Sequence, residues 1–178
     1  KGQSQGAFIQ LRGDFESGIH RGRFHPIDEH LYVTGMQGWG TYATKDGCLQ
    51  RVRRTTGPTH LPTQVRAHAN GVWIKFSEPV EASKIELLKS AVAIAWNYRY
   101  SPAYGSPEFS PSSPMLKGHD VLAIKGIHVL GNKQEVFVEI PSMRRFNQLQ
   151  VRLEPWKNDV KDVFLTVHNP REDFSGWD

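Results

Sequence analysis

The sequence contains a single cysteine, Cys48, among 178 residues. One cysteine cannot form an internal disulfide, a CxxC metal knuckle or the CxxCH motif that attaches a c-type haem. Cys48 stands at the start of a segment that alternates apolar and polar side chains, which indicates a small packed residue rather than a nucleophile. We therefore expect neither a disulfide scaffold nor a haem attached to this chain.

Long apolar runs are also absent from the sequence. None approaches the roughly 18–20 residues that a membrane-spanning helix needs. The sequence also lacks the pattern of a signal peptide, in which charged residues are followed by an apolar segment. We therefore expect any export signal to have been removed or to lie outside this sequence.

Charge of one sign is not concentrated anywhere in the chain. The 22 Lys and Arg residues exceed the 18 Asp and Glu residues by four, and the pI is about 9.3. The basic residues are scattered among acidic ones, and the densest group is Arg51, Arg53 and Arg54. Proteins that bind nucleic acid gather such charge on one surface, so we expect no nucleic-acid partner.

The first 57 residues alternate short apolar segments with turn residues. Strands are predicted at 8–11, 22–25, 30–35 and 48–54, with a long loop over 38–47 that carries Trp39 and Tyr42. Four short antiparallel strands make a unit the size of one propeller blade, which needs neighbouring blades to be stable. Two prolines and a glycine between 55 and 62 then indicate a linker.

The remaining residues, 58–178, show the pattern of a second all-β domain. Asn70-Gly71 predicts a tight hairpin turn between strands 65–68 and 72–76, because a type I′ turn needs two residues with positive φ. A short helix is predicted over 81–90, capped by Ser83, and a long loop over 101–118. Further strands are predicted at 91–100, 121–130, 135–140, 148–153 and 163–168. This spacing favours an immunoglobulin-like or fibronectin-like β-sandwich.

Two groups of residues are candidate binding sites. His20, Arg21, Arg23 and His25 combine two imidazoles and two guanidiniums around a glycine, which suits an anion or an acidic cofactor; the alternative is an exposed strand end. The aromatic residues Trp96, Tyr98, Tyr100 and Tyr104 suit a sugar ring or a partner protein, although Trp96 and Tyr98 fit a sandwich core better. Tyr104, inside the loop, stays open between the two.

Motifs for catalysis and metal binding are absent. The eight histidines show no metal-ligand spacing, and no serine is flanked as in GxSxG. The carboxylates of the second domain show no pairing that argues for acid–base chemistry. We predict no catalytic residues and no metal site in this chain.

Several segments resemble a known family. Residues 15–26 (FESGIHRGRFHP), 31–35 (LYVTG) and 46–52 (DGCLQRV) are similar to the closing blade of large secreted propeller proteins related to glucose/sorbosone dehydrogenases. These proteins occur in planctomycete-type bacteria and are often fused to a c-type cytochrome domain. Residues 76–79 (FSEP), 96–98 (WNY) and 136–141 (VFVEIP) resemble the immunoglobulin-like module at their C-terminus.

The resemblance implies a periplasmic or extracellular protein in which this chain is a non-catalytic accessory or docking module. Its partners would be the remainder of a propeller, a cytochrome domain or carbohydrate, contacted by Trp39, Tyr42 and Tyr104. Alternatively, the chain belongs to a quinone- or haem-dependent sugar oxidoreductase, and the segment from His20 to His25 contributes to its site. In either case the haem or quinone would be held elsewhere in the parent protein. A third alternative is purely structural: the sandwich covers an open edge of the propeller.

Overall fold

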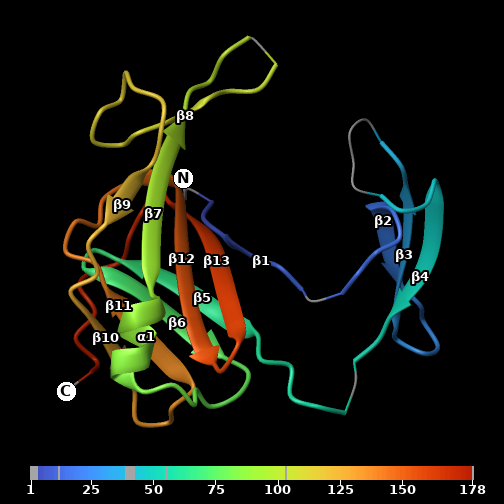
Figure 1. Ribbon diagram of the computed structural model, residues 1–178, viewed down its shortest axis with the longest axis horizontal. Coiled ribbons are helices and arrows are strands. Elements are labelled where there is room, and N and C mark those ends of the chain that lie inside the picture. Colours follow the sequence, from blue (N-terminus) through green and yellow to red (C-terminus); the bar gives the residue numbers. More distant parts are fainter. Residues whose placement is uncertain (1–3, 12, 39–42, 55, 103, 178) are drawn as a thin grey trace. The chain divides into compact units, whose positions relative to one another are not determined.

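The computed structural model describes residues 4–11, 13–38, 43–54, 56–102 and 104–177. Strands account for most of the ordered secondary structure, and the described residues contain thirteen strands and one short helix (Figure 1). The prediction of an all-β chain is confirmed. The described residues form neither a closed barrel nor a propeller.

The chain divides into two compact units. The larger unit consists of Lys1–Gln10 together with Pro58–Asp178, and the smaller unit consists of Leu11–Gly57. The linker predicted over 55–62 therefore contains the point where one unit ends and the other resumes. The first ten residues differ from the prediction, which placed them with the rest of 1–57.

Two sheets make up the larger unit. Its strands are β1 (Ala7–Ile9), β5 (Pro62–His68), β6 (Gly71–Phe76), β7 (Val92–Tyr98), β8 (Glu108–Phe109), β9 (Asp120–Leu122), β10 (Gly126–Val129), β11 (Glu135–Glu139), β12 (Phe146–Trp156) and β13 (Asp159–Val167). The first sheet has the order β1-β13-β12-β7, and both β8 and β9 pair with β7. The second sheet has the order β10-β11-β6-β5, and all of these pairs are antiparallel.

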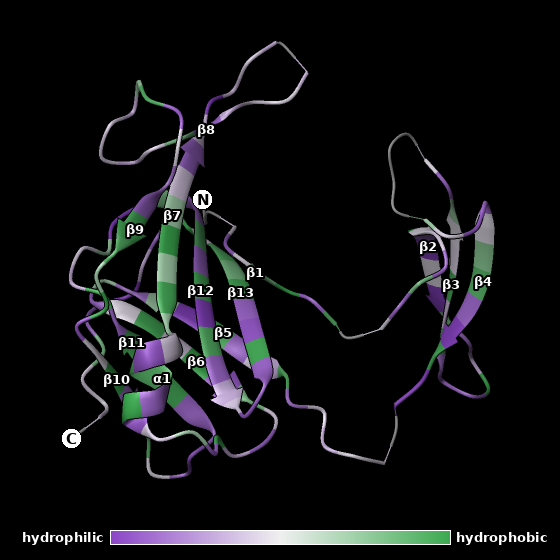
Figure 2. Ribbon diagram, viewed as in Figure 1, coloured by the Kyte–Doolittle hydropathy of each residue, from purple (hydrophilic) through white to green (hydrophobic). Residues whose placement is uncertain are grey.

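One hydrophobic core lies between the two sheets. Side chains alternate between the faces of a strand, and Figure 2 shows hydrophobic stretches along the strands of both sheets. The core-facing residues of β6 and β11 in one sheet and of β12 and β13 in the other belong to a single cluster. Its fully buried members include Val72, Ile74, Val136, Val138, Leu149, Val151, Leu153 and Val167. Burial of each such side chain stabilises the fold by about 1.5–3 kcal/mol.

A hairpin of β5 and β6 forms where the sequence predicted one, but the predicted type I′ turn at Asn70-Gly71 is wrong, because Gly71 belongs to β6 and Asn70 does not have positive φ. His68 pairs with Gly71, so Ala69 and Asn70 form the turn between them. Gly71 has φ +157°, and a Cβ atom there would lie 2.1 Å from the Val138 oxygen. Only glycine fits this position, because β11 packs directly against the start of β6.

The predicted helix is also present, with a later start. Helix α1 spans Lys84–Ser90, and Ser83 caps it as predicted. The Ser83 hydroxyl accepts a hydrogen bond from the Glu86 amide, and the Glu86 carboxylate accepts one from the Ser83 amide. Leu87 anchors the helix in the core.

Trp96 does not lie in the core, contrary to the prediction. Ala93 and Ala95 of β7 point into the core, so the period-two alternation places Trp96 on the outer face of the sheet. There its ring stacks on His119, with centroids 4.6 Å apart. The small alanines leave room for the large side chains of the opposite sheet.

The described residues of the smaller unit form a three-stranded antiparallel sheet rather than the predicted four-stranded blade. It consists of β2 (Gly18–Phe24), β3 (Leu31–Met36) and β4 (Gly47–Val52), in that order. The first strand predicted for it became β1, which pairs with β13 in the larger unit. Ala7 and Ile9 match the core-facing Leu165 and Val163 in register, a pairing across more than 150 residues that local patterns do not reveal.

Candidate functional site

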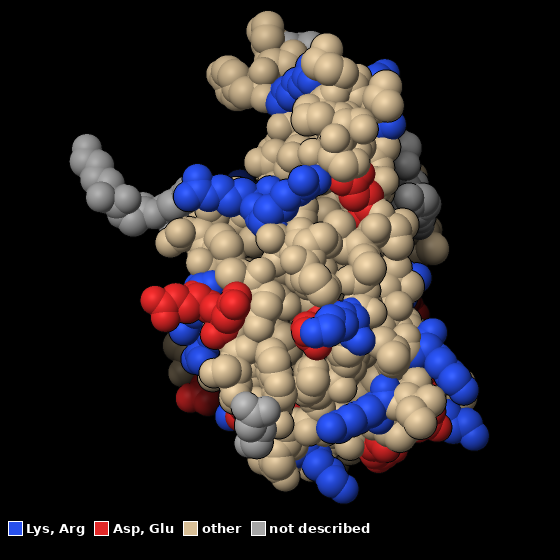
Figure 3. Space-filling model, turned by 90° about the vertical axis from the view of Figure 1, so that its left-hand side faces the viewer, with Lys and Arg blue, Asp and Glu red and all other residues tan. Residues whose placement is uncertain are grey.

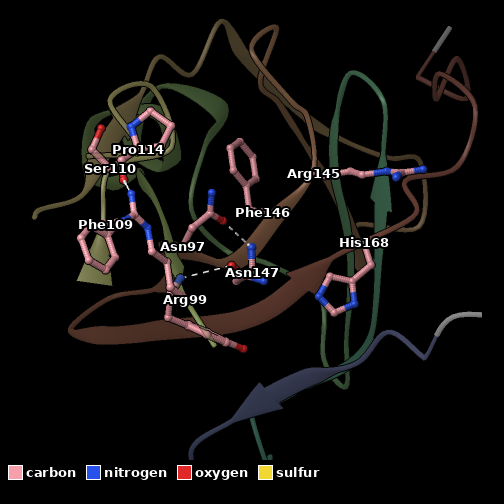
Figure 4. A pocket seen from close by; sticks show the side chains of 10 residues that line it. Asn97, Arg99, Phe109, Ser110, Pro114, Arg145, Phe146, Asn147 and His168 are labelled. Carbon is pink, nitrogen blue, oxygen red and sulfur yellow. Dashed lines mark hydrogen bonds between the residues drawn. The ribbon is translucent and has the colours of Figure 1, made fainter. Parts of the chain in front are cut away.

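A pocket opens at the end of the larger unit where β7 ends and β12 begins. Its volume is about 430 Å³, and Figure 4 shows the side chains around it. The lining residues come from the end of β7, from β8 and the loop after it, from the start of β12 and from the position after β13. They are Asn97, Tyr98, Arg99, Phe109, Ser110, Pro114, Arg145, Phe146, Asn147 and His168.

Two asparagines hold the centre of this pocket in a reciprocal arrangement. The Asn97 side-chain oxygen accepts a hydrogen bond from the Asn147 amide at 2.8 Å, and the Asn147 oxygen accepts one from the Tyr98 amide at 3.1 Å (Figure 4). Because backbone amides only donate, these bonds fix which end of each carboxamide is oxygen. Within the described part of the chain, neither Nδ2 group donates a hydrogen bond, so each is left as a donor for a ligand.

His168 adds a hydrogen-bond acceptor. Its Nδ1 lies 3.2 Å from the Ser4 carbonyl oxygen, which can only accept. Nδ1 therefore carries the proton in the neutral imidazole, and Nε2 is the acceptor. The pocket thus combines donors and an acceptor from segments far apart in the sequence.

Aromatic and guanidinium groups form the walls. Phe146 is 1% exposed, while the Arg99 guanidinium lies 4.4 Å from the Phe109 ring centroid. One Arg99 nitrogen also donates a hydrogen bond to the Pro114 carbonyl. Among the described residues, no carboxylate lies within salt-bridge distance of Arg99 or Arg145. The pocket is accordingly apolar in its walls and neutral to basic in charge.

Asp120 fixes the loop that closes one side of the pocket. Its carboxylate accepts hydrogen bonds from the Ser110 hydroxyl at 2.5 Å and from the Ser112 amide at 2.7 Å, and it lies 3.5 Å from Arg144. Burial opposes ionisation of this carboxyl, but the hydrogen bonds from the two serines and the charge of Arg144 outweigh it. The pKa of Asp120 therefore lies below its ordinary value of 3.8.

Order in the loop at 110–113 is expected to depend on ionisation of Asp120. Because the folded pKa is lowered, the stabilisation is present above pH 3.8 and is lost as the pH falls through the lowered value. Asp120→Asn should remove it at all pH values and speed amide hydrogen exchange of Ser112 by about tenfold, measured by NMR. Asp46→Asn, in the smaller unit, is the control; equal exchange rates in both variants would contradict this role.

A second hollow adjoins the first. Its volume is about 400 Å³, and it shares Tyr98, Arg99 and Asn147 with the first pocket. Its other lining residues come from the loop after β7; they are Tyr100, Ser101, Gly105 and Ser106. Tyr100 and Tyr104 are fully exposed on this loop. Of the aromatic residues predicted to contact a ligand, Tyr104 precedes the lining residue Gly105 but is not itself a lining residue, and Trp39 and Tyr42 lie outside the described residues.

The residues predicted to bind an acidic cofactor are only partly brought together. Arg21 and Arg23 share one face of β2, and the strand register adds Tyr32 and Arg51 to that face. His20 lies at a β-bulge, and His25 leaves the strand to contact Asp28 and Tyr32. This face could hold carboxylate groups of a cofactor. In the described part of the chain, no three His, Cys, Asp or Glu residues are grouped to hold a metal ion.

Sequence reasoning missed the two asparagines and His168. Asn97 and Asn147 lie 50 residues apart and meet because β7 and β12 are neighbours. Asn97 stands in the WNY segment at 96–98, but nothing in that segment marks it as a binding residue, and only the strand pairing brings it to Asn147.

Comparison with known proteins adds no relative. No protein-family model, no curated protein and no solved structure matches this chain.

The described residues contain no helix that is long and apolar enough to cross a membrane. On the face that Figure 3 presents, acidic and basic side chains are interspersed with large uncharged areas.

Proposed function

We propose that the larger unit is an immunoglobulin-like accessory module that binds carbohydrate, without catalysing a reaction, in a larger exported protein. The observation that carries this proposal is the reciprocal pair of Asn97 and Asn147, which presents two donors between aromatic walls. The parent protein would be dehydrogenase-like, with its haem or quinone held outside this chain.

The order of the strands supports an immunoglobulin-like fold. An immunoglobulin domain of the constant type has strands A, B, E and D in one sheet and G, F and C in the other. Across one sheet of the larger unit, the order β5-β6-β11-β10 matches the order A-B-E-D. Across the other sheet, the order β13-β12-β7 matches G-F-C. β9, on the far side of β7, corresponds to an added C′ strand.

The chemistry of the pocket supports a sugar as ligand. Sugar hydroxyls both donate and accept hydrogen bonds, and the pocket offers the Nδ2 donors of Asn97 and Asn147 and the Nε2 acceptor of His168. The C–H faces of a sugar ring pack on aromatic rings such as Phe109 and Tyr98. Apart from the imidazole of His168, the lining groups named here are carboxamides, guanidiniums and aromatic rings, which hold a ligand rather than transfer its protons, and this favours binding over catalysis.

In the same proposal, the smaller unit docks on the remainder of a propeller. One face of its sheet carries apolar side chains, which are those of Ile19, Phe24, Leu31, Val33 and Val52. Phe24 is 75% exposed and Ile19 is 39% exposed within this chain. Exposure of such an apolar face to water is unfavourable, so we expect another protein surface to cover it.

Asn147→Asp is expected to weaken carbohydrate binding by tenfold or more. The aspartate keeps an oxygen that accepts from the Tyr98 amide, so the local geometry survives, but it loses the Nδ2 donor. Loss of one such hydrogen bond costs about 1–3 kcal/mol. The measurement is binding of the full chain to a panel of immobilised glycans, followed by calorimetry with the glycans that bind.

Asn158→Asp supplies the matched control. Asn158 lies in the turn between β12 and β13, at the opposite end of β12 from the pocket, so the same substitution should leave binding unchanged. If the folded wild-type chain binds no glycan in the panel, the proposed function is wrong. If both variants bind equally well, carbohydrate binds elsewhere on the chain.

A further inference from the structure

The two hollows at the end of the larger unit lie side by side and share a wall. Tyr98, Arg99 and Asn147 line both of them. Asn97 and His168 line only the first hollow, and Tyr100 and Ser106 line only the second. A ligand that fills both hollows must therefore pass over the three shared residues.

Each hollow alone has a modest size. The volumes of about 430 Å³ and 400 Å³ lie near the lower end of the roughly 300–1,000 Å³ of small-molecule sites. One hollow suits a ligand with a single ring. Two adjoining hollows of similar size suit a ligand that repeats a similar unit.

The second hollow is bounded by a loop that the chain fixes in place. The Ser106 hydroxyl accepts a hydrogen bond from the Arg99 amide at 3.0 Å and donates one to the Pro107 carbonyl at 2.9 Å. Gly105 has φ +76°, a conformation that favours glycine and turns the chain back beside β7. The loop thereby holds its backbone close to the residues that line the first hollow.

The accessible groups of the second hollow are again suited to a sugar. Tyr100 is fully exposed, so its ring face and its hydroxyl are both available to a ligand. The shared Asn147 carboxamide lies between the hollows, where it can donate to hydroxyls of a ligand in either one. No Asp or Glu is among the lining residues described for either hollow, so the side chains available to a ligand there are neutral or basic.

We infer that the ligand is an oligosaccharide chain and that the second hollow is a second subsite, which binds the sugar unit next to the one held by Asn97 and Asn147. This inference rests on the proposed function, since it specifies the carbohydrate that the same pocket binds. Tyr100 is the residue that distinguishes the second subsite from the first.

The test measures how affinity depends on the length of the sugar chain. Cello-, xylo- and malto-oligosaccharides of one to six units are titrated into the full chain, and binding is followed by calorimetry and by NMR shifts of the Asn147 and Ser106 amides. In the series that binds, affinity should rise at least tenfold from one unit to two or three and then level off. Shifts at Ser106 should require two or more units.

Tyr100→Ala separates the two subsites. It should abolish the gain with chain length, so that longer chains bind at least tenfold more weakly, while the affinity for one unit changes less than twofold. Because Tyr100 is fully exposed, the variant keeps the fold, which circular dichroism verifies. Asn97→Asp, confined to the first hollow, should weaken binding at every chain length.

Two outcomes would overturn the inference and are distinguishable. If binding is equal for one unit and for longer chains, and Tyr100→Ala has no effect, the second hollow is not a subsite although the proposed function stands. If none of the series and no glycan of the immobilised panel binds the folded chain, the proposed function fails together with the inference.

Discussion

Trp156→Ala is expected to lower the free energy of unfolding of the larger unit by about 3–5 kcal/mol. Trp156 is 3% exposed, and its ring meets Phe76 edge-on at 5.4 Å and stacks on His60 at 4.2 Å. Its indole nitrogen also donates a hydrogen bond to the Pro79 carbonyl at 2.9 Å. The truncation leaves a cavity, an unpaired carbonyl and an unstacked imidazole at the same time.

Urea denaturation followed by circular dichroism measures this loss. Trp156→Phe should cost less, because it keeps most of the apolar contact with Phe76 and loses only the indole hydrogen bond and part of the volume. Tyr104→Ala is the control at a fully exposed aromatic residue and should change stability by less than about 0.5 kcal/mol. A cost below about 1 kcal/mol for Trp156→Ala would show that Trp156 does not anchor the core.

Local features of the larger unit were predictable because each depends on residues close together in the chain. The position of the hairpin and the Ser83 cap were predictable from residue types that few backbone positions favour, although the turn of the hairpin consists of Ala69 and Asn70 rather than of Asn70 and Gly71. The long loop between β7 and β9 follows from its many Pro, Ser and Gly residues, although β8 forms a short strand within it. These signals are independent of the rest of the fold.

Features that depend on distant residues were not predictable in this way. The side of the sheet on which Trp96 lies is set by which face of β7 meets the core, and the pairing of β7 with β12 decides this. The pairing of β1 with β13 leaves only a three-residue signal at Ala7–Ile9. The two asparagines of the pocket meet only because β7 pairs with β12, so the sequence carried no signal for them, and Tyr104, which the sequence did single out, is not among the residues that line the pocket.

Asp159→Ala is expected to destabilise the larger unit by about 3–5 kcal/mol, because it leaves a buried ammonium group without its partner. Asp159 is 5% exposed and Lys161 is 7% exposed, and the Lys161 Nζ lies 2.6 Å from the Asp159 Oδ1. The other carboxylate oxygen lies 3.1 Å from His60 Nδ1. The side chain of Asp159 therefore joins the segment before β5 to the start of β13.

Combining Asp159→Ala with Lys161→Met should restore most of the lost stability, because the methionine fills a similar volume and carries no charge to desolvate. Urea denaturation of the wild type, both single variants and the double variant gives the coupling energy, which we expect to exceed about 2 kcal/mol. Lys125→Met is the control at a pair whose lysine is 68% exposed, and it should cost less than about 1 kcal/mol. Additive costs of Asp159→Ala and Lys161→Met would contradict direct pairing. Recovery in the double variant, which is the expected result, would show that the buried pair mainly offsets the cost of its own desolvation.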